Sequence, residues 1–197
     1  MDFNVVAAGI GGQGIVLFSE ILAKAMLLEG QNPSFYVHSG LAQLGGSVSS
    51  HIRAGERICP KITHGCADII LSLELSEILH AVSYLKKDGK VLISTLTRMP
   101  YHSTMVPERY PTVETIRNLF SEGGVEPVFI PADTIAREVG NIQALNMVML
   151  GALVAVSNFV DTESVVTTIR ETIEKGADIN VEGFWKGYEF ISGKDYN

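Results

Sequence analysis

Glycines near the start of the chain have the spacing of a phosphate-binding turn. Gly9, Gly11 and Gly14 fit the pattern G-x-G-x-x-G within the stretch VVAAGIGGQGIVLFSE. In such a turn the first glycine allows a tight bend and the second lets the backbone approach a phosphate. The N–H groups of the following helix then face the anion. A purely structural interpretation stays open, because glycines are also needed where a helix packs closely after a buried strand.

The turn is not followed by the residue that would make it a dinucleotide site. A carboxylate about 20 positions further on, at the tip of the second strand, normally holds the ribose hydroxyls of NAD. The expected strand ends in YVHSG and offers only His38 and Ser39, and Glu29 falls at the end of the preceding helix. This tip also has no arginine for the 2′-phosphate of NADP. The sequence therefore disfavours a plain dehydrogenase.

The elements that must position the turn follow from the spacing of apolar residues. Residues 3–8 have the composition of a buried strand, residues 13–29 carry apolar positions at helical spacing, and residues 33–39 supply a second strand. Together they predict a strand–helix–strand unit with the glycine turn at its first junction. Residues 40–62, around a glycine pair, indicate an irregular loop and a short hairpin.

The rest of the chain continues the alternation of strands and helices. Strands are expected at 67–75, 91–95 and 125–131, and helices at 76–90, 112–120, 132–140, 142–156 and 161–176 and in a last segment around 184–191. In this scheme Asp88 and Gly89 end the helix 76–90, Thr112 and Asp161 are N-caps, and Gly176 is a stop. The pattern predicts an α/β fold: one three-layer Rossmann-like domain over residues 1–197, with a mostly parallel central sheet and a short hairpin insertion.

Composition and charge exclude several classes of function. The formal net charge is −7, from 15 basic and 22 acidic residues, and no basic run is present, which argues against a nucleic-acid partner. The longest apolar run, from Met147 to Val156, is shorter than the roughly 20 residues that span a bilayer, and no targeting leader is recognisable. We therefore expect a cytoplasmic protein without a membrane partner.

The cysteines do not suffice for a cluster-bound electron carrier. Cys59 and Cys66 are the two cysteines of the chain, whereas an iron–sulfur cluster generally needs about four thiolates. With His64 they form a C-x4-H-x-C pattern, which we interpret as coincidence because structural zinc normally takes four ligands in recognisable spacing. No metal ligand and no catalytic residue is predicted.

Two stretches together carry a family resemblance. GIGGQG, read with HSGLAQLGGSVSSHIRAG, resembles the gamma-type subunit or domain of the 2-oxoacid:ferredoxin oxidoreductases, and the likeness continues through ADIILSLELSEILHAVSYLKKDGKVLIST into the C-terminal helices. The resemblance implies a non-redox subunit of an oxygen-sensitive enzyme that oxidatively decarboxylates a 2-oxoacid, such as indolepyruvate or another aryl pyruvate, to an acyl-coenzyme A. The electrons would pass to ferredoxin.

The resemblance also implies how the cofactors are divided. Thiamine diphosphate and the iron–sulfur clusters would belong to a larger alpha subunit, and this chain would not be active alone. Coenzyme A is the ligand implied for the present chain, since its phosphates suit a helix N-terminus. A homodimer of the isolated chain stays open. The alternatives are a free-standing Rossmann-like nucleotide-binding protein or reductase, and a scaffold in which the glycine turn has no ligand.

The predicted cofactor-binding residues come from the glycine turn and from the second glycine loop. They are Gly9, Gly11, Gly12, Gln13, Gly14, Ser39, Gln43, Gly45, Gly46 and Ser47. In the second loop, Leu44 stands where the family usually has an arginine, and leucine cannot contact an anion as arginine would.

Four further features allow more than one interpretation. The amide of Gln13 would contact either a ligand or the backbone at the helix start. Glu74 follows a buried strand and is better explained as a favourable charge at a helix N-terminus than as a ligand contact. His51 is expected to be an ordinary hydrogen-bonded histidine. The apolar helix 142–156 would be buried either in this core or against a partner.

Overall fold

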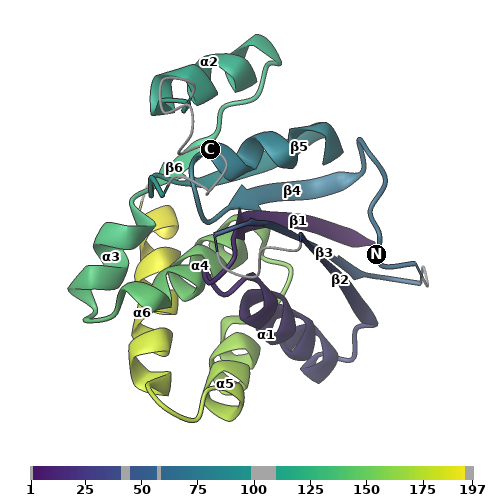
Figure 1. Ribbon diagram of the computed structural model, residues 1–197. Coiled ribbons are helices and arrows are strands. Elements are labelled where there is room, and N and C mark those ends of the chain that lie inside the picture. Colours follow the sequence, from purple (N-terminus) through teal and green to yellow (C-terminus); the bar gives the residue numbers. More distant parts are fainter. Residues whose placement is uncertain (1, 41–44, 57–58, 99–109, 194–197) are drawn as a thin grey trace.

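The computed structural model describes residues 2–40, 45–56, 59–98 and 110–193 (Figure 1). Its centre is a six-stranded sheet in the order β2-β3-β1-β4-β5-β6. The strands are β1 (Phe3–Ile10), β2 (Pro33–Ser39), β3 (Ser47–Ala54), β4 (Ala67–Ser72), β5 (Leu85–Ser94) and β6 (Val128–Ile130). Strands β1, β4, β5 and β6 are parallel neighbours, and β3 runs antiparallel between β1 and β2. The expectation of a mostly parallel α/β sheet is confirmed.

Helices cover the sheet on both faces (Figure 1). The helices are α1 (Ile15–Leu28), α2 (Val113–Glu122), α3 (Ala132–Glu138), α4 (Leu145–Ser157), α5 (Thr162–Thr172) and α6 (Ala177–Ser192), with 3-10 turns η1 (Ser76–His80), η2 (Val82–Tyr84) and η5 (Ile142–Ala144). One core lies between the sheet and α1, α4, α5 and α6, and it includes Phe18, Leu150 and Phe184. A smaller core lies on the opposite face, beneath η1 and α2, and includes Ile78 and Phe120.

The described residues of the segment 40–62 do not form the hairpin expected within it. Its residues 47–54 form one strand, β3, which pairs along its whole length with β1 on one side and through residues 48–54 with β2 on the other. The period-two pattern explains the strand: Val48, Ser50, Ile52 and Ala54 alternate with Ser47, Ser49, His51 and Arg53. The antiparallel pair is thus made with β2, across the second glycine loop.

The amphipathic helix expected at 76–90 is wrong. This stretch forms η1 and η2 and then the first part of β5. Ile78 is buried as expected, but Leu79 is 40% exposed. Asp88, with a φ of 62°, and Gly89 lie where the register between β4 and β5 shifts, so they make an irregular bend inside a strand and do not end a helix.

Two predicted caps are confirmed. The Thr112 hydroxyl accepts a hydrogen bond from the Thr115 N–H at the start of α2, and Asp161 accepts one from the Glu163 N–H at the start of α5. Gly176 does not end α5, which stops at Thr172, but directly precedes α6.

The apolar helix at 142–156 is buried inside this chain. Its α-helical part, α4, packs against α6, where glycines let the two backbones meet. A Cβ added at Gly187 would lie 1.9 Å from the Val148 carbonyl oxygen, and one added at Gly151 would lie 1.9 Å from that of Phe184. Of the two interpretations left open by the sequence, burial in this core is therefore confirmed. Within the described ranges, no helix combines the length and apolar character needed to cross a membrane.

Candidate functional site

The glycine turn lies at a topological switch point of the sheet. Strand β1 continues into α1, which packs on one face, whereas its neighbour β4 continues into η1, which packs on the other. Where adjacent parallel strands send their connections to opposite faces, a crevice opens at their carboxyl ends, and ligands of open α/β folds bind there. The turn between Gly9 and Gly14 follows the carboxyl end of β1 at this switch point.

The turn has a conformation that depends on glycine. Gly12 and Gly14 have φ values of 96° and 80°, in the region that side chains other than glycine rarely adopt. Gly14 is the N-cap residue of α1, and this helix start has neither a side-chain cap nor an acidic residue in its first turn. Its first N–H groups therefore keep their capacity for an anion.

Asn146, at the start of α4, holds the glycine turn through a side-chain hydrogen bond. Its side-chain Nδ2 donates to the Gly14 carbonyl at 3.3 Å, and the residue is 2% exposed. A Cβ on Gly14 would lie 2.4 Å from that Nδ2 atom. Sequence reasoning missed Asn146. The signal available was a lone polar residue at the start of an otherwise apolar helix.

Gln13 uses its side chain within the protein. Its Oε1 accepts a hydrogen bond from the Ile10 N–H at 2.7 Å, and its Nε2 donates to the Leu73 carbonyl at 3.3 Å. Gly9 leaves room for this side chain, since a Cβ there would lie 2.9 Å from Oε1. Of the two interpretations, the structure shows backbone contact, and Gln13 bridges the ends of β1 and β4.

The two glycine stretches, about thirty residues apart in sequence, meet in space. The Gly11 N–H donates to the Gly46 carbonyl at 2.7 Å, and the Gly45 N–H donates to the Gly11 carbonyl at 3.3 Å. Ser39 lies at the exposed end of β2 and pairs with Val48, two residues after Gly46. Gln43 and Leu44 lie outside the described residues. The predicted site residues that the structure describes lie at the end of the sheet where β1 passes into α1.

Ser47, the last of the predicted residues, contacts an acidic side chain that the sequence did not single out. Its hydroxyl donates to the Glu77 carboxylate at 2.5 Å, and Glu77 is 1% exposed on η1. Ser47 is thereby engaged within the protein and ties the start of β3 to η1. Because a helix was expected over residues 76–90, the sequence gave no reason to single out Glu77.

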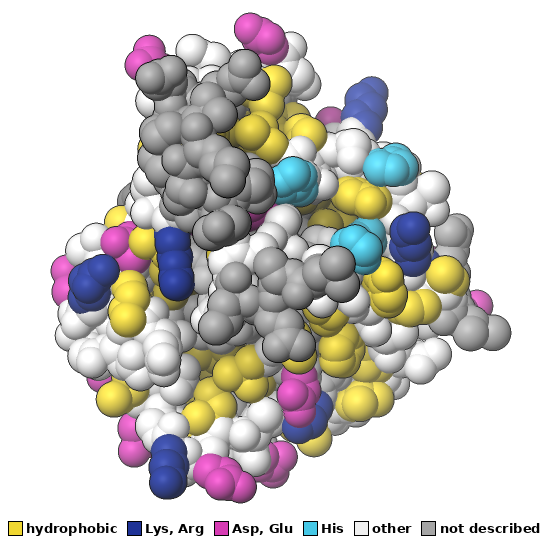
Figure 2. All heavy atoms as spheres, in the orientation of Figure 1, with side chains coloured by type: hydrophobic (Ala, Val, Ile, Leu, Met, Phe, Trp, Pro, Cys, Tyr) yellow, Lys and Arg dark blue, Asp and Glu magenta, His cyan; other side chains and the backbone are white. Residues whose placement is uncertain are grey.

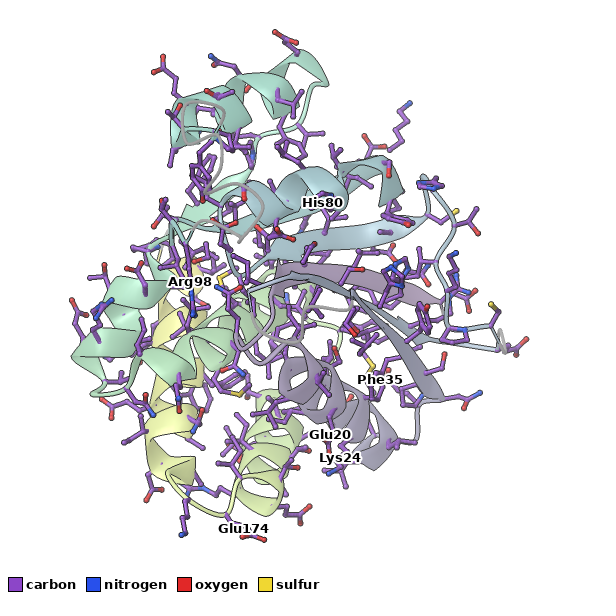
Figure 3. All side chains as sticks on the ribbon, viewed as in Figure 1. Glu20, Lys24, Phe35, His80, Arg98 and Glu174 are labelled. Carbon is purple, nitrogen blue, oxygen red and sulfur yellow. The ribbon has the colours of Figure 1, made fainter. Side chains whose placement is uncertain are left out.

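Glu74 is a fully buried carboxylate with many donors. One oxygen accepts from the Ser76 N–H at 2.8 Å, the Ser76 hydroxyl at 2.7 Å and the Glu77 N–H at 3.1 Å. The other accepts from the Arg98 N–H at 3.2 Å and from the Tyr110 hydroxyl. Arg98, labelled in Figure 3, lies on the segment that leaves β5. The carboxylate thus joins the connections that follow β4 and β5. It accepts from N–H groups at the start of the 3-10 turn η1, and not at the start of the helix expected over 76–90.

Tyr110 keeps its proton as the partner of Glu74. Burial first, and then the hydrogen bond to the Glu74 carboxylate and its charge, raise the pKa of the Tyr110 hydroxyl well above its ordinary value. Tyr110 therefore remains a donor throughout the neutral range. Both oxygens of Glu74 accept hydrogen bonds from the protein, which makes this carboxylate a structural centre near the switch point.

The cysteine–histidine pattern does not form a metal centre in the described part of the chain. Cys59 and Cys66 are free thiols on the surface, and no three His, Cys, Asp or Glu side chains there come together as metal ligands. The His64 ring stacks on Tyr84 at 4.4 Å between centroids and lies 2.9 Å from the Ser83 hydroxyl. The described residues do not fit a four-thiolate iron–sulfur cluster.

His51 is a buried, neutral histidine. It is 3% exposed on β3, its Nδ1 accepts from the Ile62 N–H at 3.1 Å, and its ring meets Tyr84 edge-on. Burial, and then the positive charges of Lys61, His38, His64 and Arg53, lower its pKa from 6.5 to about 4. The expected ordinary, hydrogen-bonded histidine is confirmed. Figure 2 shows histidine side chains next to hydrophobic ones on the face that it presents.

This histidine predicts an acid-dependent loss of stability. Between pH 6.5 and about 4, His51 binds a proton in the unfolded chain but not in the folded one, so the free energy of unfolding falls as the pH falls. From pH 7.5 to pH 5 we expect a loss of about 2 kcal/mol from this group. Urea unfolding at both pH values measures it. His51→Gln should reduce the difference, and His80→Gln, at an exposed position, should not. Equal pH dependence in the wild type and His51→Gln would contradict the prediction.

A large hollow lies away from this site. It measures ≈880 Å³ and is lined by residues of the first part of β5 and of the ends of α2, α4 and α6. At its wall the Lys90 ammonium donates to the Val156 carbonyl at 2.8 Å, a favourable place for a cation because helix C-termini carry negative partial charge. The glycine turn follows the carboxyl end of β1, whereas the hollow lies at the amino end of β5. The turn and the hollow are therefore at opposite ends of the parallel strands. We place the candidate site at the carboxyl edge.

Comparison with known proteins agrees with this geometry. Residues 4–190 match the family described as pyruvate ferredoxin/flavodoxin oxidoreductase. The chain belongs to this family. The indolepyruvate oxidoreductase subunit IorB of Methanothermobacter thermautotrophicus is 33% identical over 190 residues, which cover 95% of this chain and 97% of that protein. The expected membership among 2-oxoacid:ferredoxin oxidoreductase subunits is thereby confirmed.

Solved structures of the oxidoreductase family share the fold. The gamma subunit of a keto/oxoacid ferredoxin oxidoreductase from Geobacter sulfurreducens superimposes with a TM-score of 0.72 at 22% identity, covering 98% of this chain and 99% of that one. A 2-oxoglutarate:ferredoxin oxidoreductase from Magnetococcus marinus, solved with 2-oxoglutarate, coenzyme A and succinyl-CoA bound, gives a TM-score of 0.76 at 19% identity. This chain covers 32% of that longer protein, so the same fold occurs both as a separate subunit and within a larger chain.

Proposed function

We propose that the chain is the non-redox subunit of a thiamine-dependent 2-oxoacid ferredoxin oxidoreductase that acts on indolepyruvate or a related aryl pyruvate. The relative IorB is named for indolepyruvate and resembles this chain over nearly its full length. A larger alpha subunit would hold thiamine diphosphate and the iron–sulfur clusters. The cysteine content supports this division of labour, since the described residues offer no cluster site.

The observation that carries a ligand role for this chain is the uncapped start of α1 at the switch point. The start of α1 has no side-chain cap and follows a turn of glycines, so its first N–H groups have hydrogen-bonding capacity for a phosphate, and the pair Gly45 and Gly46 lies beside this turn. Coenzyme A carries such phosphates and is the acyl acceptor of the proposed reaction; its thiol would take the acyl group. Our proposal is that the turn helps to hold a phosphate of coenzyme A while the chemistry takes place on the partner subunit.

The division into subunits is tested by reconstitution. The chain alone should be colourless and inactive, and it should co-purify under anaerobic conditions with a larger, cysteine-rich, thiamine-binding protein. Mixing the two should restore 2-oxoacid-dependent reduction of ferredoxin. Repeated recovery of the chain alone, together with measurable NAD or NADP binding, would instead support a free-standing nucleotide-binding protein.

The coenzyme A role predicts a selective effect of a negative charge at the start of α1. Val16 lies in the first turn of this helix and is 54% exposed. In Val16→Glu the carboxylate interacts favourably with the helix dipole, so the fold should not lose stability, but it repels a bound phosphate. We expect the KM for coenzyme A of the reconstituted enzyme to rise about tenfold, which corresponds to about 1.4 kcal/mol, and the KM for the 2-oxoacid to stay unchanged.

Two controls separate this effect from others. Val16→Gln has a similar shape without the charge and should keep the KM for coenzyme A. Leu27→Glu introduces the same charge at the other end of α1, where the residue is 59% exposed, and should also leave it unchanged. An unaltered KM in Val16→Glu would show that the turn does not hold a phosphate, even if the reconstituted enzyme is active.

A further inference from the structure

Strand β2 forms an edge of the sheet that lacks the usual protection against pairing. Its seven residues pair in regular register with β3, and among the described residues no strand lies on its other side. The stretch PSFYVHS contains no Lys, Arg, Asp or Glu, and its proline is the first residue of the strand. Natural edges are normally blunted by shortness, inward charges, prolines or bulges. The opposite edge, β6, has only three residues.

Large side chains of β2 are exposed on both faces of the sheet. Phe35 is 39% exposed and lies on the α1 side, since it stands opposite the buried core residue Ile52 (Figure 3). Tyr36 is 41% exposed on the other face, opposite His51. A second strand placed beside β2 would therefore satisfy the free backbone groups and cover an aromatic ring on each face.

The sequence of β2 is complementary to itself in one register. When two copies overlap fully and run antiparallel, the middle residue, Tyr36, stands opposite its own copy. Phe35 then faces Val37 of the second copy on the α1 side, and Ser34 faces His38 on the other side. Aromatic pairs, aromatic–β-branched pairs and hydrogen-bonding pairs stabilise antiparallel neighbours. The strand contains no Asp, Glu, Lys or Arg, so no two such side chains of equal charge face each other in this register.

We propose that β2 pairs antiparallel with β2 of a second copy of this chain, which joins the two sheets across a two-fold axis next to Tyr36. Two-fold dimers use the same patch on both copies, and a self-complementary edge is such a patch. This inference does not depend on the proposed oxidoreductase function.

The oligomeric state of the full chain tests the proposal. Sedimentation equilibrium should show a dimer, and Tyr36→Lys should weaken it at least tenfold, because a lysine on an edge strand opposes pairing. The matched control is Leu119→Lys on α2, where the residue is 44% exposed at the other end of the molecule. It should leave the dimer unchanged. A monomer in the wild type, or a dimer that is insensitive to Tyr36→Lys, would overturn the proposal.

Cysteine cross-linking tests the register, independently of any loss of stability. In a background with Cys59 and Cys66 replaced by serine, Tyr36→Cys brings two sulfurs face to face, since opposed antiparallel residues have Cα atoms about 4.5–5.5 Å apart and disulfides bridge such distances. Ser39→Cys places its copies about 20 Å apart, because each lies three residues from the axis. Oxidation should cross-link the first variant only. Cross-linking of both or of neither would contradict this pairing, as would co-expression data in which Tyr36→Lys releases the partner subunit and not the second copy.

Discussion

Replacing Glu74 with alanine is expected to lower the free energy of unfolding by about 3–5 kcal/mol. The carboxylate is fully buried and accepts hydrogen bonds from three backbone N–H groups and two hydroxyls. Its removal leaves these donors unpaired, and each unpaired buried donor costs about 1–3 kcal/mol. The connections after β4 and β5 would also lose their common partner. Urea unfolding of the purified chain measures the change.

Two further variants show whether the network of Glu74 is responsible. Glu74→Gln keeps the shape, but its NH2 group must face one of the two sets of donors, so the loss should be smaller than in the alanine variant yet still well above 1 kcal/mol. Glu114→Ala removes an exposed carboxylate from the first turn of α2 and should change stability by less than about 0.5 kcal/mol. If Glu74→Ala behaved like Glu114→Ala, the carboxylate would not be a structural centre.

Gly187→Ala is expected to cost at least about 3 kcal/mol, at the upper end for overpacked cores. The added Cβ would lie 1.9 Å from the carbonyl oxygen and 2.9 Å from the Cα of Val148, both backbone atoms of α4. These atoms can only yield if the two helices move apart. Alanine is favoured over glycine inside a helix by about 1 kcal/mol, and the clash outweighs this gain. The midpoint of thermal unfolding and the urea midpoint should both fall.

A neighbouring glycine on the same helix provides the control. Gly183 lies one turn earlier on α6, and a Cβ there would meet the Ala144 Cβ at 3.3 Å. This contact, and one of 3.4 Å to the Ala144 carbonyl oxygen, are much longer than the contacts at Gly187, so the helix propensity of alanine should offset them. Gly183→Ala should therefore be close to neutral. If both variants lost equal stability, a general sensitivity of α6 to substitution, and not the contact with Val148, would be the cause.

The local elements near the glycine turn could be predicted because their patterns are short-range. The buried strand at residues 3–8, the glycine spacing and the apolar face of α1 each lie within one stretch of sequence, and all correspond to observed elements. The caps Thr112 and Asp161 were predictable for the same reason, since a cap bonds to a backbone N–H two or three residues away. The structure of the segment 76–90 could not be predicted in this way, because the spacing of its apolar residues fits a helix. The long-range pairing of β5 with β4 decides its structure.

The sequence by itself determined the α/β class, the glycine turn between a strand and a helix, and the family, because each depends on residue order and local spacing. The tertiary structure decided which side chains meet at the turn. Gln13 bonds to Leu73, Asn146 supports Gly14, and Glu74 gathers donors from three segments. These contacts join residues separated by up to 132 positions. Only the packing of the sheet and helices brings such distant hydrogen-bonding groups within reach, and no local pattern encodes it.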